Sequence, residues 1–76
     1  MYVEAGKYLA RVRLDGVDIS SDCYAADDQR GLTWCYQRDR DGRRRVVRDR
    51  FTGTHIATEV RSGDVEISDV VRKPVA

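Results

Sequence analysis

The sequence alternates apolar and polar residues with a period of two, and this pattern limits the fold more than any other feature. In the segment YLARVRL, residues 8–14, every second residue is apolar. Such alternation is typical of a β-strand with one buried face. Asp15-Gly16 follows, a pair typical of a two-residue hairpin turn, and it sets Leu14 opposite Val17. The segment therefore predicts the first hairpin of a β protein.

Two more short segments have the composition of strands. Residues 23–26 and residues 32–37 are rich in aromatic and small apolar side chains, and residues 27–31 between them are polar and end in glycine. We expect a hairpin with all five of these residues in its loop. That register places Tyr24 opposite Trp34.

A third hairpin is predicted at Asp41-Gly42, again with a two-residue turn. The register of this turn would bring Phe51 opposite Leu32 and lengthen the same sheet. We expect one face of the hairpin to join the core with its apolar side chains, which are Leu32, Trp34, Tyr36, Val47 and Phe51.

Ser62-Gly63 predicts a last hairpin, between residues 56–60 and residues 65–67. No segment has the spacing of a stable amphipathic helix, and no apolar run approaches the roughly 18 residues of a membrane span. The fold class is therefore all-β. We expect a small antiparallel meander of hairpins, either as a curled sheet or as a small barrel.

The 76 residues are enough for one domain. We expect residues 1–6 to form an N-terminal lead-in and residues 7–68 to form the single β domain. Residues 69–76 contain the only proline and should form a frayed C-terminal tail. A core this small gives little stability, so support from self-association into a homo-oligomer is plausible.

Positive charge is concentrated in one segment. The chain has a net charge of +1, but residues 38–50 hold seven Arg and three Asp, which is +4. Arginine and aromatic residues are enriched at protein interfaces. We therefore expect this hairpin to contact a protein partner, either another copy or a host protein, through Arg40, Arg43, Arg44, Arg45 and Arg48. The functional alternative is nucleic-acid binding by the same hairpin. The structural alternative is a solvated hairpin whose charges form cross-strand ion pairs.

Cys23 and Cys35 are the only cysteines. The predicted hairpin register places them opposite each other, so they form either a cross-strand disulfide or two free thiols. Their spacing is far from the Cys-x-x-Cys pattern of redox enzymes.

Other residues with chemical potential are isolated. His55 is the only histidine and has no nucleophile or carboxylate at a recognisable spacing, so we expect a structural role in a strand or loop. Asp22, Asp27 and Asp28 are expected to form turns. We therefore expect no catalytic residues, no metal site, no cofactor and no enzymatic activity.

Several short segments, taken together, are similar to those of a known group of proteins. The run Leu14–Ser20 (LDGVDIS), the run Cys23–Asp27 (CYAAD) and the later turn signatures Asp41-Gly42 and Thr52-Gly53 resemble those of small uncharacterised β-rich proteins of tailed bacteriophages and prophages. The resemblance covers about residues 8–67. It implies a viral accessory protein located in the host bacterial cytoplasm or in the virion, which is either a virion or assembly component or a binder of a host protein. It implies no catalytic residues.

Overall fold

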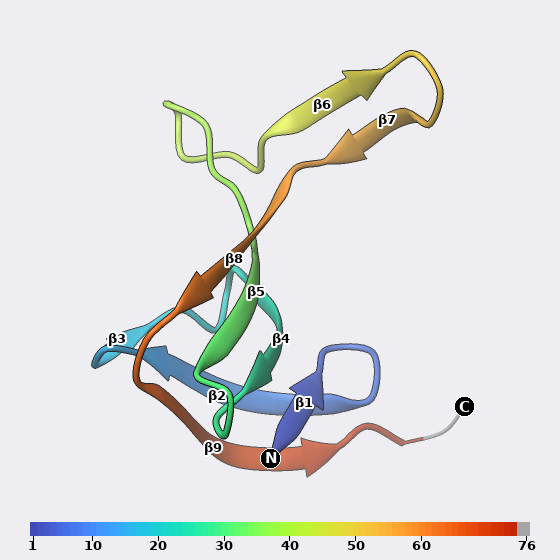
Figure 1. Cartoon of the computed structure of the whole chain (residues 1–76). Coiled ribbons are helices and arrows are strands. Elements are labelled where there is room, and N and C mark those ends of the chain that lie inside the picture. Colours follow the sequence, from blue (N-terminus) through green and yellow to red (C-terminus); the bar gives the residue numbers. More distant parts are fainter. Residues whose placement is uncertain (75–76) are drawn as a thin grey trace.

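The computed structural model describes residues 1–74 and confirms an all-β protein, with no helix among these residues (Figure 1). The strands form three antiparallel sheets, in the orders β1-β4-β5-β8, β3-β2-β9 and β6-β7. No sheet in the described part of the chain closes into a barrel, so the open form of the predicted meander is the one adopted. The strands are β1 (Tyr2–Glu4), β2 (Tyr8–Leu14), β3 (Val17–Asp18), β4 (Cys23–Asp27), β5 (Leu32–Tyr36), β6 (Val46–Asp49), β7 (Gly53–Ile56), β8 (Thr58–Ser62) and β9 (Val65–Arg72).

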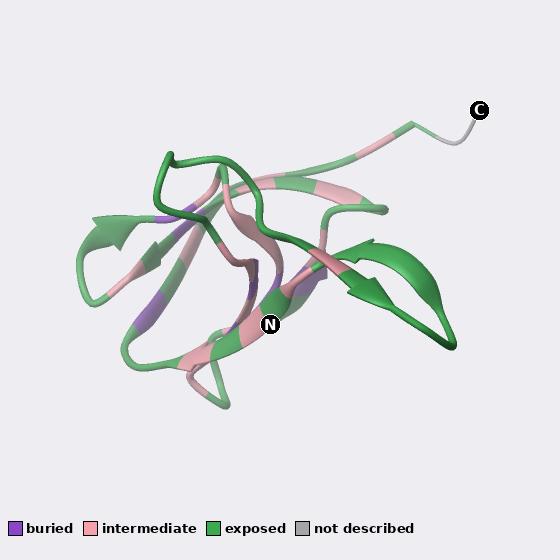
Figure 2. Ribbon diagram, turned by 90° about the horizontal axis from the view of Figure 1, so that it is seen from above, coloured by how far each residue is buried: buried purple, intermediate pink, exposed green. Residues whose placement is uncertain are grey.

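The core lies between the four-stranded and the three-stranded sheets. On β5 the buried residues Thr33 and Cys35 occupy alternate positions, as the period of two predicts, whereas β4 buries the consecutive Ala25 and Ala26 next to its bulge. Figure 2 shows the buried residues confined to this part of the molecule. We call it the body, residues 1–37 and 57–74. The main cluster contains Val3, Val12, Ile19, Ala26, Cys35 and Val65.

The first hairpin has the predicted register. Leu14 pairs with Val17 across a turn in which both Asp15 and Gly16 have positive φ angles, 50° and 83°. Two successive positive φ angles define the type I′ turn that Asp-Gly favours. Local turn chemistry was therefore enough to place this pair of strands.

The second hairpin differs from the prediction by one β-bulge. Cys23 pairs with Cys35 as expected, but Trp34 pairs with Ala25 and not with Tyr24. Asp27 pairs with Leu32, so it belongs to β4 and the loop contains four residues. The bulge adds one residue to β4, a feature that the alternating pattern does not reveal.

The predicted hairpin at Ser62-Gly63 is wrong. β8 pairs with β5, and β9 pairs with β2, so the chain passes from one sheet to the other at this point. Two hydrogen bonds fix the crossing: the Gly63 N–H donates to the Gly31 carbonyl at 3.0 Å, and the Asp64 N–H donates to the Asp15 carboxylate at 2.8 Å. Placing β8 and β9 in different sheets lets each sheet cover the other.

Both ends of the chain belong to the sheets. The predicted lead-in contains β1, which pairs with β4 and buries Val3. The predicted frayed tail is also wrong as far as Arg72, which pairs with Tyr8 in the three-stranded sheet. Pairing with β2 and packing of Val70 against the core extend β9 beyond the predicted end. Residues 75–76 of that tail lie outside the described part of the chain.

Candidate functional site

Residues 38–56 leave the body as a separate projection, which we call the arm (Figure 1). Its root is a three-way junction of backbone hydrogen bonds. The Gln37 N–H donates to the Ala57 carbonyl at 2.9 Å, the Ala57 N–H to the Arg45 carbonyl at 2.8 Å, and the Arg45 N–H to the Gln37 carbonyl at 2.9 Å. The junction divides the arm into a loop, residues 38–44, and a hairpin, residues 46–56.

Asp41-Gly42 does form a turn, but within the small loop. The Asp39 carboxylate accepts hydrogen bonds from the Asp41 and Arg43 N–H groups at 2.9 and 3.0 Å, and Gly42 has a φ of 77°. The long hairpin predicted around this turn is wrong, because the edge of β5 that would have received it is occupied by β8.

The hairpin of the arm is formed by β6 and β7, with Val46 opposite Ile56 and Asp49 opposite Gly53. Residues 50–52 form its turn. The Asp49 carboxylate accepts a hydrogen bond of 2.8 Å from the Phe51 N–H, and this bond stabilises the ionised form and lowers the pKa of Asp49. The tip of the hairpin is therefore shaped by turn chemistry and not by packing.

Phe51 lies at this tip with 92% of its surface exposed. The prediction that it pairs with Leu32 and joins the core is wrong, because β6 and β7 pair only with each other in the described structure. The spacing of Asp49 and Gly53 around a three-residue turn is the sequence signal that could have indicated this position.

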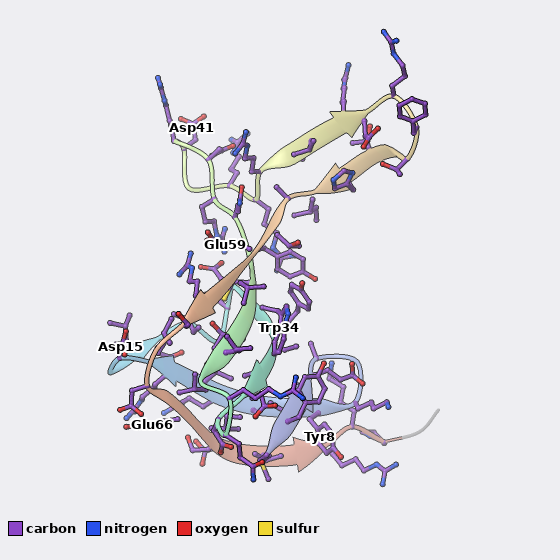
Figure 3. All side chains as sticks on the ribbon, viewed as in Figure 1. Tyr8, Asp15, Trp34, Asp41, Glu59 and Glu66 are labelled. Carbon is purple, nitrogen blue, oxygen red and sulfur yellow. The ribbon has the colours of Figure 1, made fainter. Side chains whose placement is uncertain are left out.

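All five predicted contact arginines are exposed on the arm: Arg40, Arg43, Arg44, Arg45 and Arg48. They belong to both parts of the arm and not to a single hairpin tip. Figure 3 shows side chains that project from both parts of the arm. Arg44 stacks over the Tyr36 ring at 4.4 Å, and Arg45 donates to the Gln37 side chain at 3.3 Å. In the described residues no side-chain hydrogen bond or ion pair is found for the other three.

Arg38 is tied to the body. Its Nε donates to the Asp22 carboxylate at 2.7 Å, and its Nη1 donates to the Gly42 carbonyl at 2.8 Å. Among residues 1–74 it is the only arginine of the arm in an ion pair. The cross-strand ion pairs expected for a merely solvated hairpin are therefore not formed within the arm. Most arginines of the arm have no ion-pair partner among the described residues.

Trp34 and Tyr36 are half-buried on the outer face of β5, and not in the core as expected. Trp34 makes an edge-to-face contact with Tyr2, with ring centroids 5.9 Å apart, and Tyr24 lies 5.0 Å from Tyr36. Inward positions of β5 are occupied by the smaller Thr33 and Cys35, both fully buried. The small side chains of β5 therefore face the core, and the large rings lie on the opposite face of the strand.

Cys23 and Cys35 are free thiols on adjacent strands. Burial, together with the neighbouring Cys35, raises the pKa of the Cys23 thiol to about 11. A thiol with so high a pKa is protonated near neutral pH and is a weak nucleophile there. Cys23 therefore lacks the lowered pKa of an activated cysteine.

The remaining candidates are separate from one another. His55 is exposed on β7 opposite Val47. Asp27 accepts hydrogen bonds from the Gln29 and Arg30 N–H groups at 3.0 and 3.2 Å, which confirms its expected role in a turn. No three metal-binding side chains come together in the described part of the chain.

The described residues include no helix with the length and apolar character needed to cross a membrane. Comparisons with protein families, with curated proteins and with solved structures found no match to this chain. The arm is therefore the candidate site on the evidence of its geometry alone.

Proposed function

We propose that the protein acts without catalysing a reaction, by binding another protein through its arm. The observation that carries the proposal is Phe51, with 92% of its surface exposed at the tip of the β6–β7 hairpin. A large ring held away from its own core gains burial only when a partner supplies a pocket. Buried aromatic side chains near the centre of an interface commonly contribute most of the binding energy.

The chemistry around Phe51 describes the partner. Val46 and Ile56 form an exposed apolar pair on the same hairpin, with 60% and 37% of their surfaces exposed. Arg48 and Arg50 belong to the same hairpin, and the arm carries a net charge of +4. A complementary surface has an apolar pocket with carboxylates at its rim.

The setting of this interaction is also a proposal. The resemblance to small proteins of tailed bacteriophages supports a partner in a virion or in a bacterial host. The partner is then a second copy of the chain, another virion protein or a host protein. The protein would act in the host cytoplasm or in the particle.

Nucleic acid is the second candidate, and one observation favours it. A two-stranded ribbon such as β6–β7 fits the major groove of duplex DNA, and its arginines could contact phosphates. The exposed apolar surface of Phe51, Val46 and Ile56 matches an apolar protein pocket better than a largely polar groove, so we place nucleic acid second.

The test begins with the immobilised protein, which captures its partner from a bacterial lysate. The captured protein is then identified, purified and titrated against the wild type and its variants. Phe51→Ala should weaken binding at least tenfold, the usual result of truncating a central aromatic residue. Leu9→Ala is the matched control, because Leu9 is 58% exposed on the body, and it should bind as the wild type does.

The charge is tested by reversing Arg40, Arg43 and Arg48 to Glu, since these three side chains have no contact that the fold needs. This variant should stay folded and lose binding. Wild-type affinity in both arm variants would contradict the proposal. Binding of a mixed-sequence DNA duplex that weakens steeply with salt, with a log–log slope near −0.9 for each phosphate contacted, would favour the second candidate.

A further inference from the structure

Cys23 and Cys35 are direct partners in the β4–β5 pair. The bond that flanks them runs from the Tyr36 N–H to the Asp22 carbonyl, at 2.8 Å. Because the bond joins the residues next to the cysteines, Cys23 and Cys35 form a non-hydrogen-bonded pair. In such pairs the strands approach most closely, with Cα atoms about 4.5 Å apart and side chains on the same face.

The separation typical of such pairs lies within the range of Cα distances that a disulfide spans, about 4.4–6.8 Å. Both thiols are free in the structure. We propose that Cys23 and Cys35 form a redox modification site, which closes reversibly to a disulfide between β4 and β5. This inference holds whichever partner the arm binds.

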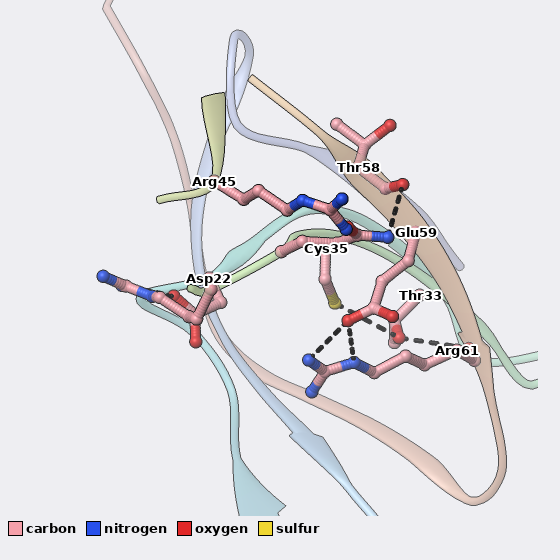
Figure 4. A network of polar contacts seen from close by, with 9 residues as sticks. Asp22, Thr33, Cys35, Arg45, Thr58, Glu59 and Arg61 are labelled. Atoms are coloured by element: carbon pink, nitrogen blue, oxygen red, sulfur yellow. Dashed lines mark hydrogen bonds and ion pairs between the residues drawn. The ribbon is translucent and has the colours of Figure 1, made fainter. Parts of the chain in front are cut away.

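The two cysteines differ in access, and this sets the order of reaction. Cys35 is fully buried, and its thiol donates to the Thr33 hydroxyl at 3.6 Å, within the polar network of Figure 4. Cys23 is half-exposed, and its thiol donates to the Ala25 carbonyl at 3.0 Å. A small oxidant in solution therefore meets Cys23 first.

A low-molecular-weight disulfide such as oxidised glutathione can supply the oxidising equivalents. The Cys23 thiol loses its proton and attacks this disulfide, which forms a mixed disulfide and releases one glutathione thiolate. Cys35 then loses its proton and attacks the Cys23 sulfur, which releases the second thiolate. The protein has lost two protons and two electrons, and the oxidant has become two thiols.

The bond would form directly below the root of the arm. Asp22, next to Cys23, holds Arg38, and Tyr36, next to Cys35, holds Arg44. A cross-link between the cysteines thus joins β4 and β5 next to the two residues, Asp22 and Tyr36, that contact the loop of the arm. Oxidation should strengthen this part of the body without moving either strand.

The experiment treats the folded full chain with excess oxidised glutathione and follows mass, free thiols and thermal unfolding. The wild type should lose both titratable thiols and two hydrogen masses while remaining a single chain. The disulfide closes a loop of about a dozen residues, so Tm should rise by roughly 10 °C or more. A reducing thiol should reverse the rise.

Single variants identify the mechanism. Cys35→Ser keeps the half-exposed thiol and should stop at the mixed disulfide with one glutathione. Cys23→Ser keeps only the buried thiol and should stay unmodified; Cys23→Ala replaces it if the serine variant does not fold. A wild type that stops with glutathione on Cys23, or that forms only links between chains, overturns the inference. Partner binding is not measured, so a negative result here leaves the proposed function untouched.

Discussion

The body and the arm are stabilised by different kinds of interaction. All residues of the buried core belong to the body, whereas the arm contains only one half-buried side chain, Val47. The body is held by alternating apolar side chains between two sheets, and the arm by turns, carboxylate caps and the backbone junction at Gln37 and Ala57. An isolated two-stranded hairpin is at best marginally stable in water. The arm therefore adds little to the packing of the body, and this agrees with the contact role proposed for it.

The net charge also differs between the body and the arm. The arm carries +4, so the rest of the chain carries −3. Among residues 1–74, Phe51 is the most exposed large apolar side chain, and it lies at the tip of the arm, where its exposure adds nothing to folding. The body could supply acidic surface to the arm of a second copy, which makes self-association one of the outcomes that light scattering would detect.

The strongest test of this difference between body and arm places a negative charge in each region. Ala26→Asp buries a carboxylate at a fully buried position of β4, and we expect the protein to unfold, with a loss of about 4 kcal/mol or more. Val46→Asp makes the same kind of change at a position that is 60% exposed on the arm. It should change the free energy of unfolding by about 0.5 kcal/mol or less.

Circular dichroism and urea unfolding measure both effects. Equal destabilisation by the two variants would mean that the arm packs on the body, and the division into two regions would be wrong.

A smaller contrast uses two glycines with positive φ. A Cβ at Gly31 would lie 2.7 Å from the Gly63 carbonyl oxygen, in the crossing between the sheets. Gly31→Ala should therefore cost about 2–3 kcal/mol, from the left-handed φ of 65° and the backbone clash together. Gly42→Ala, in the arm, meets no atom within 4 Å and should cost about 1 kcal/mol, confined to the loop. Hydrogen exchange would show whether the second effect stays local, and its spread to β5 amides would count against the comparison.

The smallest effect concerns pH. The pKa of Cys23 is raised from 9.0 in the reference state to about 11 in the body, so the folded protein holds this proton more tightly than the unfolded chain. Its contribution to stability is complete below pH 9 and is lost as the pH rises to about 11. Because the thiol is half-exposed, we expect a loss of only about 1 kcal/mol.

The measurement is the difference in unfolding free energy between the wild type and Cys23→Ala, because this difference isolates the contribution of the Cys23 thiol. That difference should be constant below pH 9 and should then shift against the wild type. A constant difference up to pH 11 would show that burial does not perturb Cys23.

The sequence predicted what is decided locally. The alternation of residues 8–14 and the turn at Asp15-Gly16 define the first hairpin, and Cys23 does oppose Cys35. These features depend on neighbouring residues, whose side-chain periodicity and backbone preferences can be derived directly. The predicted contact arginines are also exposed, because charge at a turn is rarely buried.

Long-range pairing could not be derived in the same way. Tyr36 pairs with Thr58 and Tyr8 with Arg72, and no local signal indicates either partner. The sequence contains a turn signature at Asp41-Gly42, but the pattern cannot tell whether the turn closes a long hairpin or a small loop. The spacing of Phe51 predicts a core position, but β8 is the neighbour of β5, so Phe51 lies outside the core.

The most direct test of the account removes the arm. Gln37 and Ala57 are hydrogen-bonded neighbours, and Tyr36 pairs with Thr58, so an Asn-Gly turn can replace residues 38–56 and join β5 to β8 as a two-residue hairpin. The measurement is a titration of this arm-less protein against the partner captured by the full chain. The account predicts a folded protein with no detectable binding. A folded arm-less protein that binds as the full chain does would contradict it and would place the contact surface on the body.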